Sequence, residues 1–488
     1  MGPIQQPSPV VAGLPDAVPI DDHLDPDRTS WARWPAHDPS PPAPSHRLSL
    51  PARDVGPLVI GLLVVGLAVL WAVGIPAGQP VGSYVGQLMG AESVLLMSVA
   101  IVLISTLPWV EEWFDGIDRA AIWHRRTAMI GIVLLLPHIL LSTNPHGAGI
   151  GGTLGIVGLI GLIALIVWAI LPRWRSILPQ PVQRPILAIG RLGALRVVNR
   201  WLGGYERWRS LHRLTGLFVA IGFIHGLMNG TAFGAAPALR WSYVAIGAIG
   251  LTVYGYRELL ARRFWPMHDY QVESSRPLAP GLLEIALTPV GRPLRFVPGQ
   301  FAMVFLEARD GWHRHPFTIS SGSGEDVLRV TVKALGDYTS ALEDLVDPGM
   351  PAVIGGPHGR FDLRRGTVRQ VWIAAGVGVA PFLSWIRSLG DDLPFEVDFF
   401  YTAAGPIPFS DEITEIAARH PSLRVHLIDS VSEGRLSSQH VLQQLAGDVT
   451  DLSLYMCGPE PLLRRFALDL RRAGVRRTRI HREYFDWR

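Results

Sequence analysis

Four histidines stand at the ends of two apolar runs, each long enough to cross a membrane. Residues 120–142 read AAIWHRRTAMIGIVLLLPHILLS, with His124 and His138, and residues 212–225 read HRLTGLFVAIGFIH, with His212 and His225. The separations are 138 − 124 = 14 and 225 − 212 = 13 residues, which in a helix correspond to roughly 20 Å. Ionisable side chains are costly inside a membrane and usually mark a functional path. Because of the separation of roughly 20 Å, the two histidines of one run are too far apart to bind one metal ion.

Pairing across the two runs gives a different result. If both helices run in the same direction, His124 faces His212 at one level and His138 faces His225 at the other. Zinc needs four ligands, or three and a water, whereas a haem iron needs only two axial donors from the protein. We therefore predict two stacked b-type haems, each with two histidine ligands. The alternative is that these are helix-end histidines bonded to backbone carbonyls or lipid head groups.

The spacing of 13 residues raises a geometric difficulty. At about 100° per residue, His212 and His225 would point about 140° apart on an ideal helix. We expect this span to rotate, to bend or to use a different side-chain reach at its two histidines, and Gly216, Gly222 and Gly226 would permit a bend. We call His124 and His212, expected near the cytoplasmic side, the inner pair, and His138 and His225 the outer pair. Four arginines flank the inner pair and either hold haem propionates or only follow the positive-inside rule: Arg125, Arg126, Arg209 and Arg213.

Composition indicates a membrane part. The 488-residue chain is 48% hydrophobic and only 17% charged, with a mean hydropathy of +0.26, which is too apolar for an ordinary soluble protein. Its net charge of +3 gives no reason to expect a nucleic-acid partner. The single cysteine, Cys457, excludes an internal disulfide and an iron-sulfur cluster held by four thiolates of this chain.

The chain divides into four predicted regions. Residues 1–50 are rich in Pro, Asp and Ser and predict a disordered tail. Residues 51–265 predict a transmembrane bis-haem domain of six helices, near 55–74, 93–110, 120–142, 153–171, 207–229 and 240–260. Residues 266–366 predict an antiparallel β-barrel, and residues 367–488, where strands alternate with helices, predict a parallel α/β domain.

Arginine placement predicts the orientation of the helices. The segments 75–92, 143–152 and 229–239 contain no Lys or Arg, whereas 172–209 contains eight arginines, the first at Arg173 and the last at Arg209. Positive loops stay in the cytoplasm. We expect a multi-pass protein of the cell membrane, embedded in the lipid bilayer, with both termini and the soluble domains on the cytoplasmic side.

Three further motifs lie in the soluble half: RHPFTISS (314–321), GVGVAP (376–381) after an apolar strand, and LYMCGPEPLL (454–463). Together with the histidine pairs, they make residues 55–488 resemble the ferric reductase and NADPH oxidase superfamily of membrane flavohaem proteins. The resemblance implies an FAD-binding β-barrel domain and an NAD(P)-binding α/β domain. An ordinary strand and a tight strand-to-helix turn are the alternatives for HPFT and GVGVAP taken singly.

The resemblance assigns cofactor contacts to particular residues. It implies that Phe317 packs on the flavin ring, that Thr318 hydrogen-bonds near the reactive flavin nitrogen, and that His315 and Pro316 belong to the same FAD segment, with His315 toward the phosphates. It places Lys333, Thr339 and Ser340 in a second FAD segment, where a helix N-terminus would receive pyrophosphate. For NAD(P)H it implies Gly376, Gly378 and Pro381, and the turn Cys457, Gly458 and Pro459 beside the nicotinamide.

Two of these assignments concern catalysis directly. Cys457 would lie near the hydride path, with a buried structural cysteine as the alternative. The C-terminal HREYFDWR resembles the family's terminal aromatic segment, which covers the flavin until nicotinamide displaces it. Phe485 is the candidate, with Trp487 as the second choice.

The implied function is transmembrane electron transfer from cytoplasmic NAD(P)H through FAD and two b-type haems to a one-electron acceptor such as a ferric chelate. A superoxide-forming oxidase that reduces O2 is one alternative, weakened because Ser142 stands where the family's oxidases have a further histidine; His146 lies in a loop nearby. A flavin reductase with a haem-free helical anchor is another. NADH is the expected donor, because Thr402, Ala403 and Ala404 offer no cation for a 2′-phosphate, although Arg435 could substitute.

Overall fold

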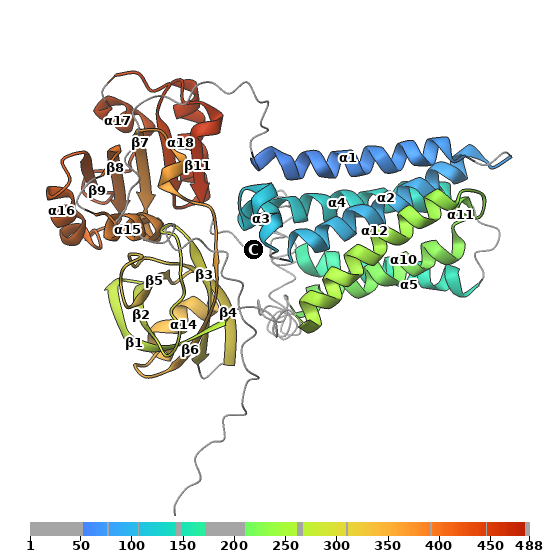
Figure 1. The fold of residues 1–488 in the computed structure, drawn as a ribbon, viewed down its shortest axis with the longest axis horizontal. Coiled ribbons are helices and arrows are strands. Elements are labelled where there is room, and N and C mark those ends of the chain that lie inside the picture. The colour runs from blue at the N-terminus through green and yellow to red at the C-terminus, as the bar shows by residue number, and fades with distance from the viewer. Residues whose placement is uncertain are drawn as a thin grey trace, which may run out of the picture.

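The computed structural model describes residues 52–75, 78–105, 107–142, 149–170, 210–260, 267–308, 311–390, 393–445 and 447–483. The predicted tail, His146, the arginine-rich segment 172–209, Phe485 and Trp487 lie outside the described residues. The described part forms a helical bundle at one end and two sheets at the other (Figure 1).

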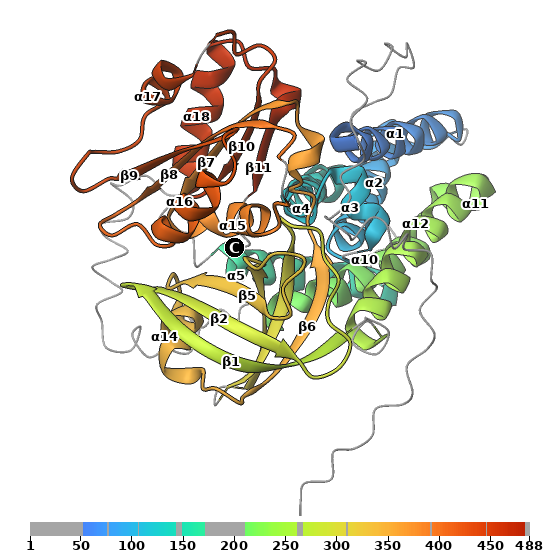
Figure 2. The same cartoon turned by 60° about the vertical axis from the view of Figure 1, so that its left-hand side comes forward.

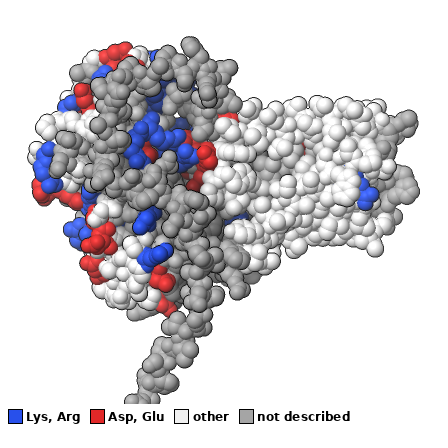
Figure 3. Space-filling view, in the orientation of Figure 1, with Lys and Arg blue, Asp and Glu red and all other residues white. Residues whose placement is uncertain are grey.

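The helical half contains α1 (Ala52–Val73), α2 (Val81–Leu103), α3 (Pro108–Phe114), α4 (Ile117–Leu141), α5 (Ile150–Ile170), α10 (Thr215–Asn229), α11 (Ala232–Ala235), α12 (Pro237–Gly255) and a π-helical turn, η3 (Tyr256–Leu260). Among the described residues of this half, five helical stretches are long and apolar enough to cross a membrane: Asp54–Val73, Val81–Leu103, Ile117–Leu141, Ile150–Trp168 and Ser210–Asn229. Large apolar side chains such as Leu62 and Val133 are 62% and 66% exposed. Figure 3 shows almost no charge on this half.

The predicted count of six spans is not confirmed. The sixth predicted stretch does form a helix, α12, but it is not among the five, and its sequence includes the charged Arg240. The second span was predicted near 93–110, whereas α2 covers Val81–Leu103 and a separate short helix begins at Pro108. The start of α2 was missed because it contains polar residues such as Tyr84. The Tyr84 hydroxyl is satisfied inside the bundle, where it donates to the Trp71 carbonyl at 2.6 Å.

The first soluble region is an antiparallel sheet of order β4-β3-β6-β1-β2-β5. Its elements are β1 (Met267–Ala279), β2 (Leu282–Pro289), β3 (Phe301–Ala308), β4 (Gly311–Thr318), β5 (Leu328–Lys333), α14 (Asp337–Leu345), β6 (Pro351–His358) and the 3-10 turn η4 (Leu363–Arg365). A single bridge between Ile319 and Val330 joins its two edges. The predicted antiparallel sheet is therefore present, whereas a fully closed barrel is not confirmed.

The second soluble region is a parallel sheet of order β11-β10-β7-β8-β9. Its elements are β7 (Arg369–Ala375), η5 (Gly376–Val379), α15 (Ala380–Arg387), β8 (Glu396–Ala403), α16 (Ser410–Ala418), β9 (Leu423–Asp429), α17 (Ser438–Gln444), β10 (Ser453–Cys457), α18 (Glu460–Arg472), η6 (Arg477–Arg479) and β11 (Ile480–Glu483). Helix α18 buries Leu463, Phe466, Ala467 and Leu470, the i, i+3, i+4, i+7 spacing of an amphipathic helix.

Helix α15 holds the two sheets together, and it lies between them in both ribbon views (Figures 1 and 2). The Trp385 indole donates to the Pro298 carbonyl at 2.9 Å, and the Ser384 hydroxyl donates to the Ser321 carbonyl at 2.8 Å. Arg387 donates to the Ser320 carbonyl and pairs with Glu412 at 2.6 Å. These buried polar contacts fix one sheet against the other at the edge where their ligands would meet.

Candidate functional site

The structure brings the four predicted haem-ligating histidines together in two facing pairs. The ring centroids of His124 and His212 are 6.3 Å apart with an interplanar angle of 89°, and those of His138 and His225 are 6.1 Å apart at 79°. Two imidazoles that bind one metal ion from opposite sides have centroids about 6 Å apart, since each nitrogen lies about 2 Å from the metal. Both pairs have the separation that a haem iron between them requires.

Hydrogen bonds orient three of these rings. The Nδ1 atom of His124 lies 2.8 Å from the Ala100 carbonyl on α2, that of His138 lies 2.9 Å from the Gly86 carbonyl on α2, and that of His225 lies 2.7 Å from the Gly151 carbonyl on α5. Metal-ligating histidines commonly donate one ring nitrogen to a carbonyl, which leaves the other nitrogen for the metal. Nδ1 is thereby occupied, and Nε2 is the nitrogen available as ligand.

A break in the fifth span lies between its two histidines. Helical residues 210–213 and α10 are separated by a turn at Leu214. Around it, Leu214 N donates to Leu211 O and Leu217 N donates to Leu214 O, both at 3.0 Å; these i→i+3 bonds add rotation per residue. Thr215 Oγ1 donates to the His212 carbonyl at 2.6 Å. This turn lies between His212 and His225 and adds rotation to the span.

Paired glycines leave room for the outer histidine rings. A Cβ on Gly90 of α2 would lie 2.7 Å from His138 Nδ1, and a Cβ on Gly155 of α5 would lie 2.7 Å from His225 Nδ1. Each lies four residues after the glycine whose carbonyl accepts that histidine's hydrogen bond. The spacing G-x-x-x-G allows close helix approach in membranes. The sequence analysis missed both glycine pairs, although the segments VGQLMG and GIGGTLG contain the G-x-x-x-G spacing.

The flanking arginines make contacts other than the proposed propionate contacts. Arg213 is paired with Glu258, and the Arg126 guanidinium lies 5.0 Å from the centroid of the Trp123 ring. Arg209 lies outside the described residues. Among the residues that the structure describes, no group of three or more His, Cys, Asp or Glu could hold a metal ion. The two-histidine levels are consistent with that finding, because haem needs only two protein donors.

The predicted flavin strand lines a cavity of about 620 Å³. Thr318 and Pro316 of β4 face it, and Thr318 lies opposite Phe301 of β3. Thr318 is 3% exposed, and its hydroxyl has no hydrogen-bond partner among the described residues. A buried hydroxyl without a partner is costly, so the site fits a flavin that supplies the missing hydrogen bond. Phe317 packs against the hydrophobic core of the sheet.

The second predicted FAD segment lies against the first. The ring of Tyr338, in the first turn of α14, stacks on His315 with centroids 3.8 Å apart. Lys333 ends β5 and is exposed, as is Ser340. The Thr339 hydroxyl accepts from the Leu335 and Gly336 amides at 3.0 and 3.1 Å. Thr339 therefore caps the helix, which leaves the exposed Lys333 and Ser340 for a phosphate.

The predicted nicotinamide residues meet at the carboxyl end of the parallel sheet. A Cβ on Gly378 would lie 2.2 Å from the Cys457 carbonyl oxygen, so the GVGVAP turn packs directly on the Cys-Gly-Pro turn. Gly376 has φ +57°, a left-handed value that favours glycine. Pro381 is buried in the first turn of α15, and Pro459 precedes α18 at its N-terminus. This edge of a parallel sheet is where nucleotides bind.

The register shows one further residue, Glu483, that sequence reasoning missed. Along neighbouring strands, Thr402 lies opposite Ala375, and Cys457 lies opposite both Ala374 and Glu483. Burial, and then the nearby Glu483 carboxylate, raises the pKa of the Cys457 thiol well above its usual range. Burial also raises the pKa of Glu483 well above its usual range, with the Asp118 carboxylate as the second cause. Its position just before the C-terminal aromatics in HREYF was the available signal.

Glu483 and Thr318 line the same cavity. One Glu483 carboxylate oxygen is buried without a hydrogen-bond partner among the described residues. The raised pKa favours the protonated form of this carboxyl. It is therefore suited to donate a hydrogen bond or a proton to a ligand in the cavity. Thr402, 8% exposed, also has a buried hydroxyl without a partner in the described part, at the end of β8.

Comparison with known proteins identifies both soluble domains. Residues 270–354 match the family described as FAD-binding domain, and residues 372–467 match the family described as oxidoreductase NAD-binding domain. The chain is 25% identical over 210 residues to a flavohemoprotein of Oceanobacillus iheyensis, covering 39% of this chain and 51% of that protein. It is 30% identical over 207 residues to the ferredoxin-NAD(+) reductase component of an alkene monooxygenase system of Xanthobacter autotrophicus, covering 40% of this chain and 62% of that protein.

Among solved structures, the FAD/NAD-binding domain of a nitric oxide dioxygenase from Vibrio cholerae matches with a TM-score of 0.40 and 21% identity, covering 45% of this chain and 98% of that one. The chain spans about half to three-fifths of the two curated relatives named above. Its C-terminal half is an oxidoreductase unit with FAD-binding and NAD-binding domains of the ferredoxin-reductase type, which passes electrons from NAD(P)H.

Proposed function

We propose that the protein is a transmembrane oxidoreductase of the ferric reductase and NADPH oxidase type. It passes electrons from cytoplasmic NAD(P)H through FAD and two b-type haems to an acceptor across the membrane, either a ferric chelate or another one-electron acceptor. The soluble domains and both termini would lie in the cytoplasm of a multi-pass protein of the cell membrane.

The two facing histidine pairs carry this proposal. A haem-free helical anchor has no reason to place imidazoles 6.3 and 6.1 Å apart at two levels, or to orient three of them through Nδ1. The inner pair lies at the end of the bundle that meets the FAD domain, because Ile117 of α4 packs against Phe301 and Met303 of β3. The outer pair lies at the opposite end.

Bound FAD would take hydride from NAD(P)H, and bound haems would carry single electrons. The chain's own residues bind, orient and exclude water. Thr318 offers its hydroxyl to the flavin, Gly378 lets the nucleotide turn pack on Cys457, and Glu483 presents a buried carboxyl group to the cavity. One NAD(P)H gives two electrons and a proton, so two one-electron acceptors are reduced outside and the proton is released on the cytoplasmic side.

The outer surroundings favour a reductase over a superoxide-forming oxidase. Ser142, at the position where a further histidine marks the oxidases of the family, lies with its Oγ 3.2 Å from His138 Nδ1. The Ser142 hydroxyl therefore contacts the predicted outer ligand, His138, and is not placed as a separate group for binding oxygen. Reduction of an external ferric chelate by membrane vesicles, measured against superoxide formation in air, separates the two activities.

The carboxyl end of the parallel sheet, where the nucleotide would bind, favours NADH over NADPH. Asp429 ends β9, and its carboxylate accepts from the Gly405 and Val431 amides at 2.8 and 2.9 Å. These hydrogen bonds, the largest from Val431, hold the pKa of Asp429 below its ordinary value, so it stays charged. An acidic residue in this region suits a ribose hydroxyl and repels a 2′-phosphate. Catalytic efficiency at least tenfold better with NADPH than with NADH would contradict this preference.

A reduced-minus-oxidised absorption spectrum of the purified protein tests the main proposal. We expect a bis-histidine b-type signal with about two haems per flavin. The variant His440→Leu is the matched control for loss of an imidazole, because His440 lies exposed on the NAD domain; its haem signal should be unchanged. Protein without haem that retains full electron transfer to an external acceptor would contradict the proposal.

A further inference from the structure

A sharp corner joins the membrane half to the flavin domain. It consists of Glu111, Asp115 and Ile117, at the end of α3 and the start of α4. Asp115 ends α3 in the left-handed conformation with φ 58°, and Gly116 follows with φ 128°. Two consecutive residues with positive φ fix the direction of the chain between the helices. We call these three residues the docking corner.

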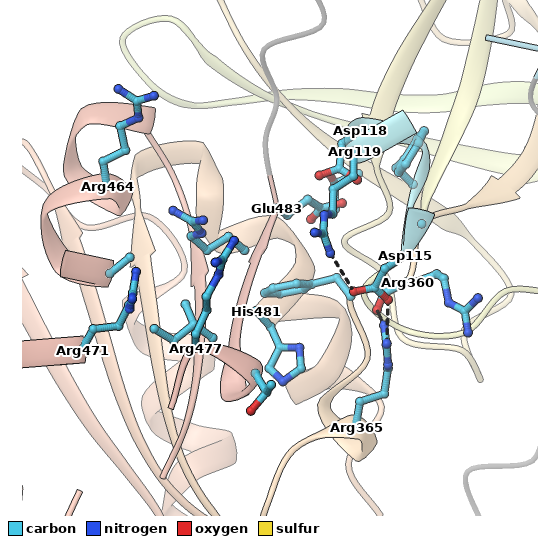
Figure 4. A pocket seen from close by; sticks show the side chains of 18 of the residues that line it. Asp115, Asp118, Arg119, Arg360, Arg365, Arg464, Arg471, Arg477, His481 and Glu483 are labelled. Atoms are coloured by element: carbon cyan, nitrogen blue, oxygen red, sulfur yellow. Dashed lines mark hydrogen bonds and ion pairs between the residues drawn. The ribbon is translucent and has the colours of Figure 1, made fainter. Parts of the chain in front are cut away.

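The docking corner contacts the FAD domain by charge and by apolar packing. Asp115 Oδ1 lies 2.6 Å from Arg365 Nη2, and Figure 4 shows Asp115 with Arg365 on one side and Arg119 on the other. Glu111 Oε1 lies 3.4 Å from His358 Nδ1 and accepts from the Gly359 amide at 3.4 Å. The contacts with Arg365, His358 and Gly359 each join residues more than 240 positions apart in the chain.

The apolar contact lies between the flavin strand and the inner histidine pair. Ile117 is 3% exposed and packs against Phe301 and Met303 of β3. Phe301 is the Cα partner of Thr318 on the neighbouring strand. Ile117 lies seven residues before His124 on the same helix, a rise of about 10 Å. A chain of contacts from the flavin strand to the inner pair therefore passes through this corner.

We propose that the docking corner positions the flavin domain for electron transfer to the inner histidine pair, and that the Asp115–Arg365 ion pair holds that position. The inference rests on the proposed function. Asp115 and Arg365 border the cavity but point at each other (Figure 4), so they act as positioning residues and not as catalytic ones. Transfer of single electrons depends steeply on separation, whereas hydride transfer within the soluble half does not depend on this contact.

Charge exchange gives the decisive experiment. Asp115→Arg places a cation beside Arg365 and Arg119, and Arg365→Asp places a carboxylate beside Asp115. Each single variant should slow haem reduction by NADH at least fivefold in stopped-flow absorbance, with reduction of a soluble dye within twofold of wild type. The double variant Asp115→Arg/Arg365→Asp restores opposite charges and should recover at least half of the lost rate.

A distance measurement tests the docking without relying on haem. Spin labels on Glu112→Cys, exposed on α3, and Val368→Cys, 55% exposed beside β7, report the separation of the two halves by pulsed electron resonance. Cys457 is fully buried and will not be labelled. The distance distribution should be narrow in wild type, broad in each single variant and narrow again in the double variant.

Arg364→Asp is the matched control. It makes the same charge change one residue away, but Arg364 pairs with Asp362 of its own domain at 2.8 Å; both readouts should stay normal. Single variants with a narrow distribution and a normal rate of haem reduction would overturn the docking proposal, as would a double variant no better than the singles. Wild-type protein without haem would instead overturn the proposed function and this inference with it, which the spectrum detects independently.

Discussion

The two histidine pairs have nearly the same geometry but different surroundings. Their ring centroids are 6.3 and 6.1 Å apart. The inner pair is backed by the Ala100 carbonyl and stands near the docking corner, whereas the outer pair is backed by glycine carbonyls. The stretches 78–90, 149–155 and 226–239, toward the outer-pair end of the bundle, contain no charged residue. Under the proposed function, ligand geometry alone gives no direction to electron flow, and the contact with the flavin domain makes the inner pair the first to receive electrons.

The largest expected effect comes from removing a ligand at either level. Both His124→Leu and His225→Leu should lower reduction of an impermeant external acceptor by at least a hundredfold, because each breaks the single route. His225→Leu should lose about half the haem signal and still show an inner haem reducible by NADH; His124→Leu should leave no haem reducible by NADH. Reduction of a soluble dye should stay normal in both variants.

Thr318→Val is the control for a defect at the flavin instead of at the histidine pairs. Thr318 lies upstream of both pairs, so this variant should slow dye reduction and external reduction together. A His225→Leu variant that reduces an impermeant acceptor at the wild-type rate would show that electrons do not leave through the outer pair.

A moderate effect is expected from filling the space behind an outer ligand. Gly155→Val would push into the His225 ring, because even a Cβ there lies 2.7 Å from ring atoms; overpacking of this kind costs about 1–3 kcal/mol. We expect a several-fold loss of outer haem and no loss of inner haem, measured by quantitative haem spectra. Gly222→Ala on α10 is the control, because a Cβ there meets nothing within 4 Å. Equal loss at both levels would break the comparison.

The smallest effect is expected from Ser142→Ala. Its hydroxyl lies 3.2 Å from His138 Nδ1, and losing one hydrogen bond of about 1 kcal/mol corresponds to a shift on the order of 40 mV for a one-electron couple. Redox titration should show this shift in one of the two haems only. A shift of the inner haem, or of both equally, would contradict the assignment of His138 to the outer level.

Much of the soluble half could be predicted from short motifs, because their chemistry is local. GVGVAP and the Cys-Gly-Pro turn each lie within a few residues of a strand end, and parallel strands bring their carboxyl ends to one edge. The HPFT segment at the end of β4 and the second FAD segment at the start of α14 were located from short motifs too. Glu483 was missed because its role depends on the register of β11 against β10, which no local pattern shows.

In the membrane half, apolar runs located helices but not their limits. The start of α2 was missed because Tyr84 and Gln87 look too polar for a span, yet Tyr84 bonds to the Trp71 carbonyl and Gln87 bonds to Thr231. Those partners lie 13 and 144 residues away. An apolar-run criterion counts the polar atoms and has no way of counting the distant atoms that satisfy them.

The sequence by itself determined the candidate ligands and their two levels, because helical rise is a local property and converts spacing directly into height. Only the tertiary structure decided which way the rings point and what stands behind them. His212 faces His124 across two helices, the glycines of α2 and α5 make room for the outer rings, and the docking corner meets the flavin strand. Each depends on contacts between segments far apart in the chain, and local propensities carry no information about such contacts.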